Sequence, residues 1–204
     1  MDTPLDVDRL LRLQADLVAR WHAAPVEVEP REPPEHYVLL NHACNFKLWH
    51  EEDQARDRQA DDARIAQNKR NIDRLNQERN DAIERLDEHL VGLLRAAHPP
   101  APPDAPLNSE TVGNIVDRLS ILSLKLYHME EESRRADADA AHRAQAADRL
   151  AILRAQRDDL AVCLRGLLGD LTHGRKRLKV YRQMKMYNDP ALNPVLYGRK
   201  PERR

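Results

Sequence analysis

The sequence predicts an all-α protein with an internally duplicated antiparallel helical bundle. The bundle consists of two hairpins of long helices, and these helices can pack as in a coiled coil. Six glycines and an aromatic content of 4% are too few for the turns and strands of a β-sandwich or barrel. The prolines are clustered and leave residues 35–98 and 107–189 without any. Because a proline inside a helix costs about 3 kcal/mol, long proline-free stretches rich in Ala, Leu, Arg and Glu indicate helices.

The proline clusters divide the chain into six segments. In the first, Leu10, Leu13, Leu17 and Trp21 recur at helical spacing, which predicts an amphipathic helix. The predicted segments are an N-terminal helix (1–23), a proline linker (24–34), a first helical hairpin (35–97), a proline loop (98–108), a second helical hairpin (109–173) and a basic C-terminal arm (174–204).

Each hairpin requires a break within a proline-free run. Residues 54–62 and 132–141 hold no large apolar side chain, so a helix there would have no face to bury. The four main helices are therefore expected near 35–56, 62–97, 109–134 and 139–173. The residues placed to cap three of them are Asp61 or Asp62, Asn108 or Ser109, and Asp137 or Asp139. The alternative is two unbroken helices that form an antiparallel rod.

The duplication is visible when the chain is shifted by 78 residues. The segment Leu48-Trp49-His50 then falls on Leu126-Tyr127-His128, and Arg79 falls on Arg157. Similarity at a fixed offset indicates equivalent units, here two hairpins related by a pseudo-two-fold axis. Coincident helical periodicity is the alternative, and it explains the shared leucines better than the shared histidine and arginine.

Composition excludes several classes of protein. The net charge of −1 excludes a globally basic nucleic-acid binder, and no apolar run approaches the roughly 18 residues that span a bilayer, so no membrane partner is expected. The first residues lack the basic and apolar regions of an export signal. The two cysteines, Cys44 and Cys163, form no disulfide or metal pattern. We therefore expect a cytoplasmic protein with reduced thiols.

Six ionisable residues lie on helix faces that are otherwise apolar. Each half contributes a histidine, a carboxylate and an arginine at corresponding positions. Because buried charges are tolerated only when they are paired and hydrogen-bonded, we expect these side chains to be largely buried and to contact one another. The six are His50, Asp53, Arg79, His128, Glu131 and Arg157.

Three interpretations of this cluster remain open. It can be a structural ion-pair network that fixes the helix register. It can be a di-metal site of the four-helix-bundle kind, although the carboxylates are few and the two arginines would repel a cation, so we assign no metal ligands. It can also bind a small anionic ligand, because arginine forks suit phosphate and carboxylate groups.

The sequence therefore predicts only a broad class of function. No glycine-rich phosphate loop, cysteine pair or HExxH motif is present, and no cofactor is indicated. The run Asn76-Gln77 with Asn80 is unusually polar, which a solvated helix face would also explain. The leading hypothesis is a non-enzymatic binding or interaction module with a protein or small-anion partner. The alternative is an enzyme or small-anion-binding protein that uses the six-residue cluster.

Three stretches of the sequence resemble a bacterial protein family of unknown function, the DUF4254 type. They are Asn45–Arg56 (NFKLWHEEDQAR), Lys69–Asp81 (KRNIDRLNQERND) and Glu110–Glu130 (ETVGNIVDRLSILSLKLYHME). The likeness extends from about residue 35 to Gly198. It implies a bacterial, helical, single-family chain and brings no mechanism with it.

The C-terminal arm is basic, whereas the rest of the chain is acidic. Residues 173–204 carry ten Lys or Arg and two acids, a net charge of +8, and residues 1–172 carry −9. A basic segment with tyrosines can bind nucleic acid through phosphate contacts and stacking. We favour packing of the arm on the acidic bundle of its own chain, which predicts that Tyr187, Leu192 and Leu196 are buried.

Overall fold

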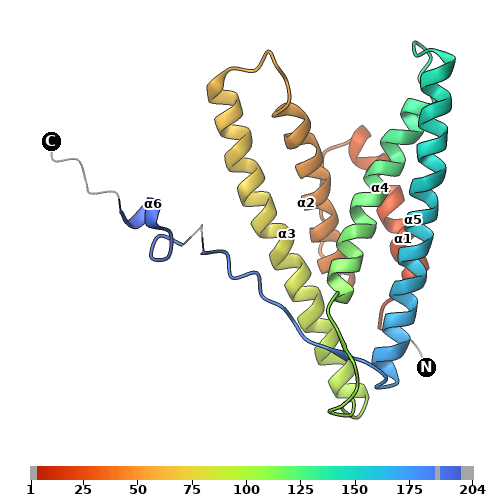
Figure 1. Ribbon diagram of the computed structural model, residues 1–204, viewed down its shortest axis with the longest axis vertical. Coiled ribbons are helices and arrows are strands. Elements are labelled where there is room, and N and C mark those ends of the chain that lie inside the picture. Colours follow the sequence, from red (N-terminus) through yellow and green to blue (C-terminus); the bar gives the residue numbers. More distant parts are fainter. Residues whose placement is uncertain (1–3, 187–188, 199–204) are drawn as a thin grey trace.

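A computed structural model describes residues 4–186 and 189–198 and confirms the all-α bundle (Figure 1). None of the helices among these residues is both long and apolar enough to cross a membrane. The elements are α1 (Val7–Ala23), α2 (Glu35–Gln54), α3 (Asp62–Ala97), β1 (Leu107–Asn108), α4 (Val112–Arg134), α5 (Ala140–Thr172), β2 (Arg177–Leu178) and α6 (Pro194–Tyr197).

Both proline-free runs are broken where the polar stretches predicted. Asp61 caps α3 by accepting a hydrogen bond from the Arg64 backbone N–H, and Asp139 caps α5 in the same way. These two caps are 78 positions apart, as the predicted shift requires. The cap of α4 is Thr111, and the prediction of Asn108 or Ser109 was wrong because β1 and the turn after it occupy those positions.

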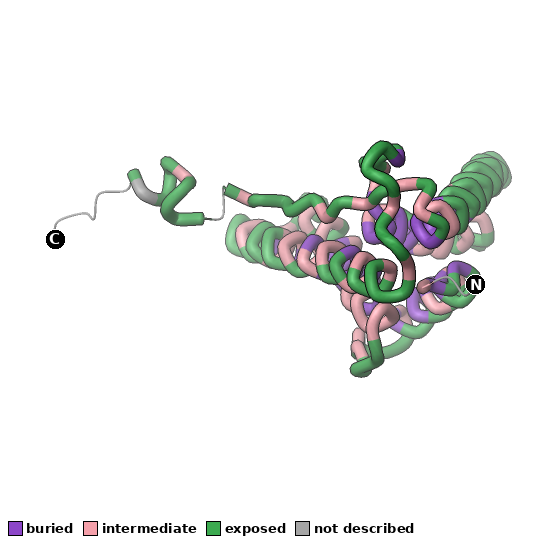
Figure 2. The backbone as a smooth tube through the Cα atoms, turned by 90° about the horizontal axis from the view of Figure 1, so that it is seen from below, coloured by how far each residue is buried: buried purple, intermediate pink, exposed green. Residues whose placement is uncertain are grey.

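The helices are arranged as two antiparallel hairpins with α1 packed against them (Figure 1). Helices α2 and α3 form one hairpin, α4 and α5 the other, and α2 lies beside α4. Helix α1 contacts α4, α2 and α5. Buried residues lie along the sides of the helices that adjoin other helices, and the arm is largely exposed (Figure 2). The internal duplication itself remains a prediction.

Two short strands were not predicted. In β1 and β2, Leu107 pairs with Arg177 and Asn108 with Leu178, in parallel. The Arg177 Nε also donates to the Ala105 carbonyl oxygen at 2.7 Å. This pairing fixes the start of the C-terminal arm to the proline loop between the hairpins.

The rest of the arm does not pack as predicted. Arg182 pairs with Glu84 and Glu88 on α3, and the Gln183 backbone N–H donates to Glu84 at 2.9 Å. Beyond this point the chain leaves the bundle (Figure 1), and Leu192 and Leu196 are 50% and 43% exposed. The predicted burial of these two leucines is therefore wrong, and Tyr187 lies outside the described residues.

Candidate functional site

The six predicted site residues do not form one network. His50 and His128 do meet, with ring centroids 6.1 Å apart, but Asp53 and Glu131 are exposed. No ion pair joins the predicted arginines to the predicted carboxylates within the described residues. Arg79 instead approaches Asp117 and Arg157 pairs with Asp158, so the expected central network has to be corrected.

The centre of the predicted cluster is filled by aromatic packing. His22, which α1 contributes, lies 5.2 Å from His50 and 4.9 Å from His128 between ring centroids. Its ring also stacks on Tyr127 at 4.3 Å. The sequence analysis missed His22 because it lies outside the two hairpins, and nothing local indicated that α1 would pack between them.

The hydrogen bonds of these histidines involve only one ring nitrogen each. His22 Nδ1 donates to the Val18 carbonyl oxygen at 2.7 Å, and His128 Nδ1 lies 3.0 Å from Glu131 Oε2. The Nε2 atoms of both rings are buried without a hydrogen-bond partner among the described residues. Burial, assisted by the other two histidines, lowers the pKa of His50. No group of three His, Cys, Asp or Glu side chains in the described ranges could hold a metal ion.

A groove on the other side of α2 resembles a binding site more closely than the histidine cluster does. This first groove has a volume of about 330 Å³ and is formed by α2, α3 and α4. Two of the predicted site residues, Asp53 and Arg79, contribute to it. Its lining residues are Asn45, Leu48, Trp49, Glu52, Asp53, Arg56, Asn76, Arg79, Ile121 and Leu124.

Several polar groups in the first groove lack partners. Arg56 pairs with Glu52 at 2.8 Å, one helical turn away. In contrast, the side chains of Asp53 and Asn76 make no hydrogen bond or ion pair with any described residue. The Arg79 Nε is buried without a hydrogen-bond partner there, and Asp117 Oδ1, its nearest carboxylate oxygen, is 3.9 Å away. Buried polar groups are normally satisfied, so the unsatisfied Arg79 is unusual. The Asp53 and Asn76 side chains are accessible to solvent and can contact a ligand.

A largely buried hydrogen-bond network holds side chains next to the first groove in place. Asp117 Oδ1 accepts from the amides of Asn41 and Asn45, both at 2.8 Å. The Asn45 amide also donates to Ser120 Oγ at 3.0 Å, and Ser120 contacts His42. These contacts fix the orientation of Asn45 and of the carboxylate that faces Arg79.

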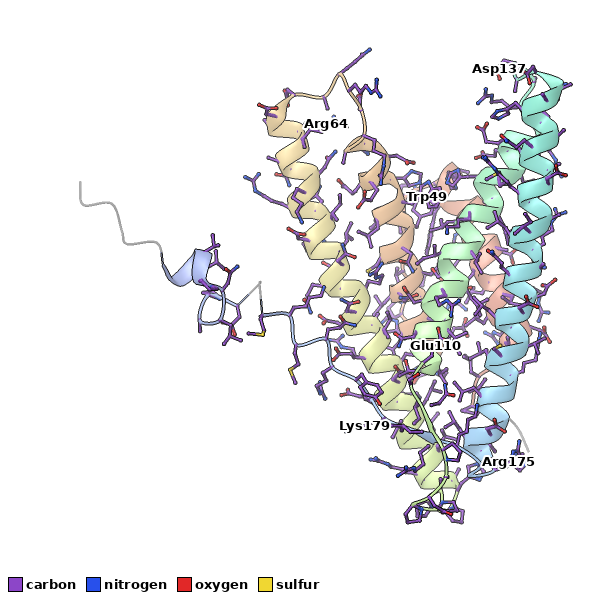
Figure 3. The ribbon with its side chains drawn as sticks, viewed as in Figure 1. Trp49, Arg64, Glu110, Asp137, Arg175 and Lys179 are labelled. Carbon is purple, nitrogen blue, oxygen red and sulfur yellow. The ribbon has the colours of Figure 1, made fainter. Side chains whose placement is uncertain are left out.

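Trp49 separates the first groove from the histidine cluster. Its side chain lies between α2 and α4 (Figure 3) and contributes to the groove lining. It also stacks on His128, with ring centroids 4.8 Å apart and an interplanar angle of 10°. The indole therefore has a fixed position before any ligand binds.

Part of this groove coincides with residues that the sequence indicates. Asp53 and Arg79 belong to the six predicted site residues and line the groove, although Asp53 is exposed, and Asn76 belongs to the polar run. Asn45, Trp49 and Asp117 were missed as site residues. A tryptophan on a helix looks like an ordinary core residue, and Asp117 becomes relevant only because α4 packs across α2 and α3.

The comparisons with known proteins agree with the resemblance and give no activity. Neither a curated protein nor a solved structure matches the chain. The model of a family described as "Protein of unknown function (DUF4254)" matches residues 35–180, which include all of the first groove and its supporting network. The chain therefore belongs to the DUF4254 family of proteins of unknown function.

Proposed function

We propose that the protein is a small-ligand-binding protein, and that the first groove binds an anionic ligand that also carries hydroxyl groups. The observation that carries this proposal is that groups of opposite charge line the same groove without a hydrogen-bonded protein partner. The Arg79 Nε is buried and unsatisfied among the described residues, and the Asp53 carboxylate is exposed to solvent. Leaving the buried Arg79 donor unsatisfied has a free-energy cost that a complementary ligand removes.

Arg79 is the expected contact for the anionic part of the ligand. Its side chain is 27% exposed, so it is accessible from the groove but partly shielded from water. Asp117 already accepts two amide hydrogen bonds, and its distance of 3.9 Å from Arg79 leaves the guanidinium donors free for a bidentate contact. Such contacts to carboxylate or phosphate are strong and directional.

The remaining groups of the groove suit hydroxyls and a ring. Asp53 accepts hydrogen bonds, and the Asn76 amide both donates and accepts, which matches neighbouring hydroxyl groups. The Trp49 indole offers an apolar face against which a ring can pack. Two arginines and two carboxylates line the groove, so a ligand with one anionic group and several hydroxyls fits the charges better than a polyanion does.

The test is a titration with three probes: inorganic phosphate, gluconate and glucose 6-phosphate. We expect glucose 6-phosphate or gluconate to bind at the first groove, and calorimetry should detect this binding. A ligand at 100 times its dissociation constant stabilises the fold by about 2.7 kcal/mol, which is measurable as a thermal shift.

The matched variants decide where the probe binds. Arg79→Ala should weaken binding at least tenfold, whereas Arg85→Ala, which removes an exposed arginine on the same helix, should leave it unchanged. Absence of binding by both hydroxylated probes at millimolar concentration would refute the proposal. Equal affinity of wild type and Arg79→Ala would do so as well.

A further inference from the structure

A second groove lies between α1, α4 and α5, with a volume of about 250 Å³. It contains Arg157, one of the predicted site residues that do not line the first groove. Its lining residues are Leu11, Gln14, Ala15, Leu119, Ser123, Leu126, Tyr127, Glu130, Leu150, Arg154 and Arg157.

The two grooves correspond to one another at many of their lining positions. Six lining residues of the first groove fall on lining residues of the second when 78 is added to their numbers. These six pairs include an aromatic pair, a glutamate pair and an arginine pair. The pairs are Asn45 and Ser123, Leu48 and Leu126, Trp49 and Tyr127, Glu52 and Glu130, Asn76 and Arg154, and Arg79 and Arg157.

Contacts inside and between the grooves follow the same shift. The ion pair of Arg56 with Glu52 at 2.8 Å has its counterpart in that of Arg134 with Glu130 at 2.6 Å. His50 and His128, which are also 78 positions apart, contact each other between the two grooves. Residues that a two-fold operation exchanges can touch only near its axis, so this contact places the pseudo-axis between the grooves.

Helix α1 closes the second groove where α4 closes the first. It contributes Leu11, Gln14 and Ala15, whereas α4 contributes Ile121 and Leu124 to the first groove. The Gln14 side chain is 1% exposed, and its Oε1 has no hydrogen-bond partner among the described residues. The second groove therefore also contains a buried polar atom that is not satisfied by the protein.

The charges of the two grooves differ. With ion-pair partners included, the first groove has Arg56 and Arg79 against Glu52, Asp53 and Asp117. The second groove has Arg134, Arg154 and Arg157 against Glu130 and Asp158. The difference arises because Asn76 corresponds to Arg154 and Asp117 to the apolar Leu39. In addition, Glu131, the counterpart of Asp53, does not line the second groove, whereas Asp158 stands where the first half has Asn80.

We propose that the second groove is a second ligand site, equivalent in descent to the first, and that it takes small molecules that carry a diphosphate group. Arg154 and Arg157 hold this group, and Tyr127 packs against the rest of the ligand. The expectation that the grooves bind ligands at all rests on the proposed function, whereas the preference for higher charge rests on the second groove alone.

The experiment is calorimetric titration of the full chain with inorganic pyrophosphate. Wild type should bind pyrophosphate at the second groove, and the double variant Arg154→Ala/Arg157→Ala should lose that event or weaken it at least tenfold. Arg149→Ala removes an exposed arginine of α5 that does not line this groove, and it should bind like wild type. Circular dichroism of each variant establishes that it is folded.

The outcomes separate this inference from the proposed function. Loss of the pyrophosphate event in the double variant, with glucose 6-phosphate binding retained, supports the second site. Pyrophosphate binding that is lost in Arg79→Ala and retained in the double variant overturns the second site and leaves the first in place. Failure of pyrophosphate to bind wild type also overturns the second site. Pyrophosphate binding lost only in the double variant, with no hydroxylated probe bound, supports the second site and removes the proposed function.

Discussion

Ser120 Oγ donates a hydrogen bond to His42 Nδ1 at 2.8 Å, and both residues are fully buried. The other ring nitrogen, Nε2, donates to the Gln14 carbonyl oxygen at 3.0 Å, which fixes the neutral tautomer. One imidazole therefore joins α1, α2 and α4 at the base of the network that supports the first groove. Ser120 is also the residue that corresponds to His42 under the 78-residue shift.

The pH dependence of stability should reveal two opposing groups. Burial lowers the pKa of His42 from 6.5 to about 4, so the unfolded chain binds the proton more readily and stability is lost as the pH falls between these values. Burial raises the pKa of Asp87 from 3.8 to about 6, so this group adds stability as the pH falls through about 6. Each effect amounts to about 3 kcal/mol, and in wild type they largely cancel.

Single variants should separate the two effects. In Asp87→Asn, the free energy of unfolding should fall as the pH is lowered from 7 to 4.5, because only His42 remains. In His42→Gln it should rise over the same interval. Urea denaturation at a series of pH values measures both profiles, and parallel profiles for the two variants would contradict this assignment.

Gly113 is required by the close contact of α3 with α4. A Cβ atom at this position would lie 2.8 Å from the Ile83 carbonyl oxygen, so the backbone of α3 would have to move. We expect Gly113→Ala to destabilise the fold by about 1–3 kcal/mol. The control is Gly166→Ala in α5, where the new methyl group meets no atom within 4 Å. That variant should gain up to about 1 kcal/mol from helix propensity, and a gain in both variants would refute the packing argument.

Arg79 should matter little for stability. Its contact with Asp117 is long and partly solvated, unlike that of a fully buried ion pair. We therefore expect Arg79→Ala to change the free energy of unfolding by less than about 1 kcal/mol. A loss of about 3–5 kcal/mol in a denaturant titration would instead show that the arginine is part of a structural network.

Two truncations should divide the C-terminal arm into a structural and a free part. Removal of residues 184–204 should leave the melting temperature unchanged, because Met184, Leu192 and Val195 are all at least half exposed. Removal of residues 174–204 also deletes β2 and Leu178, which packs against the core. That variant should lose about 1–2 kcal/mol, as partial burial of one leucine implies, and scanning calorimetry would measure both.

The sequence by itself determined the five long helices and most of their ends. Prolines and polar stretches set the segments, and side chains such as those of Asp61 and Asp139 cap helices through contacts only three residues away. Such local interactions can be read from the chain because they do not depend on how the helices pack. Helical spacing also selected Asp53, Arg79 and Arg157 as polar residues on otherwise apolar stripes, and the three line the two grooves.

Only the tertiary structure decided what those residues contact. A helical period shows which face of a helix is buried, but it does not show which neighbour lies against that face. The six selected residues were therefore expected to meet. Instead Asp53 and Arg79 line the first groove and Arg157 lines the second. His50 and His128 pack with His22 from α1 between the grooves. The exposed end of the arm has the same cause: Leu192 and Leu196 are apolar in sequence, but among the described residues they remain 50% and 43% exposed.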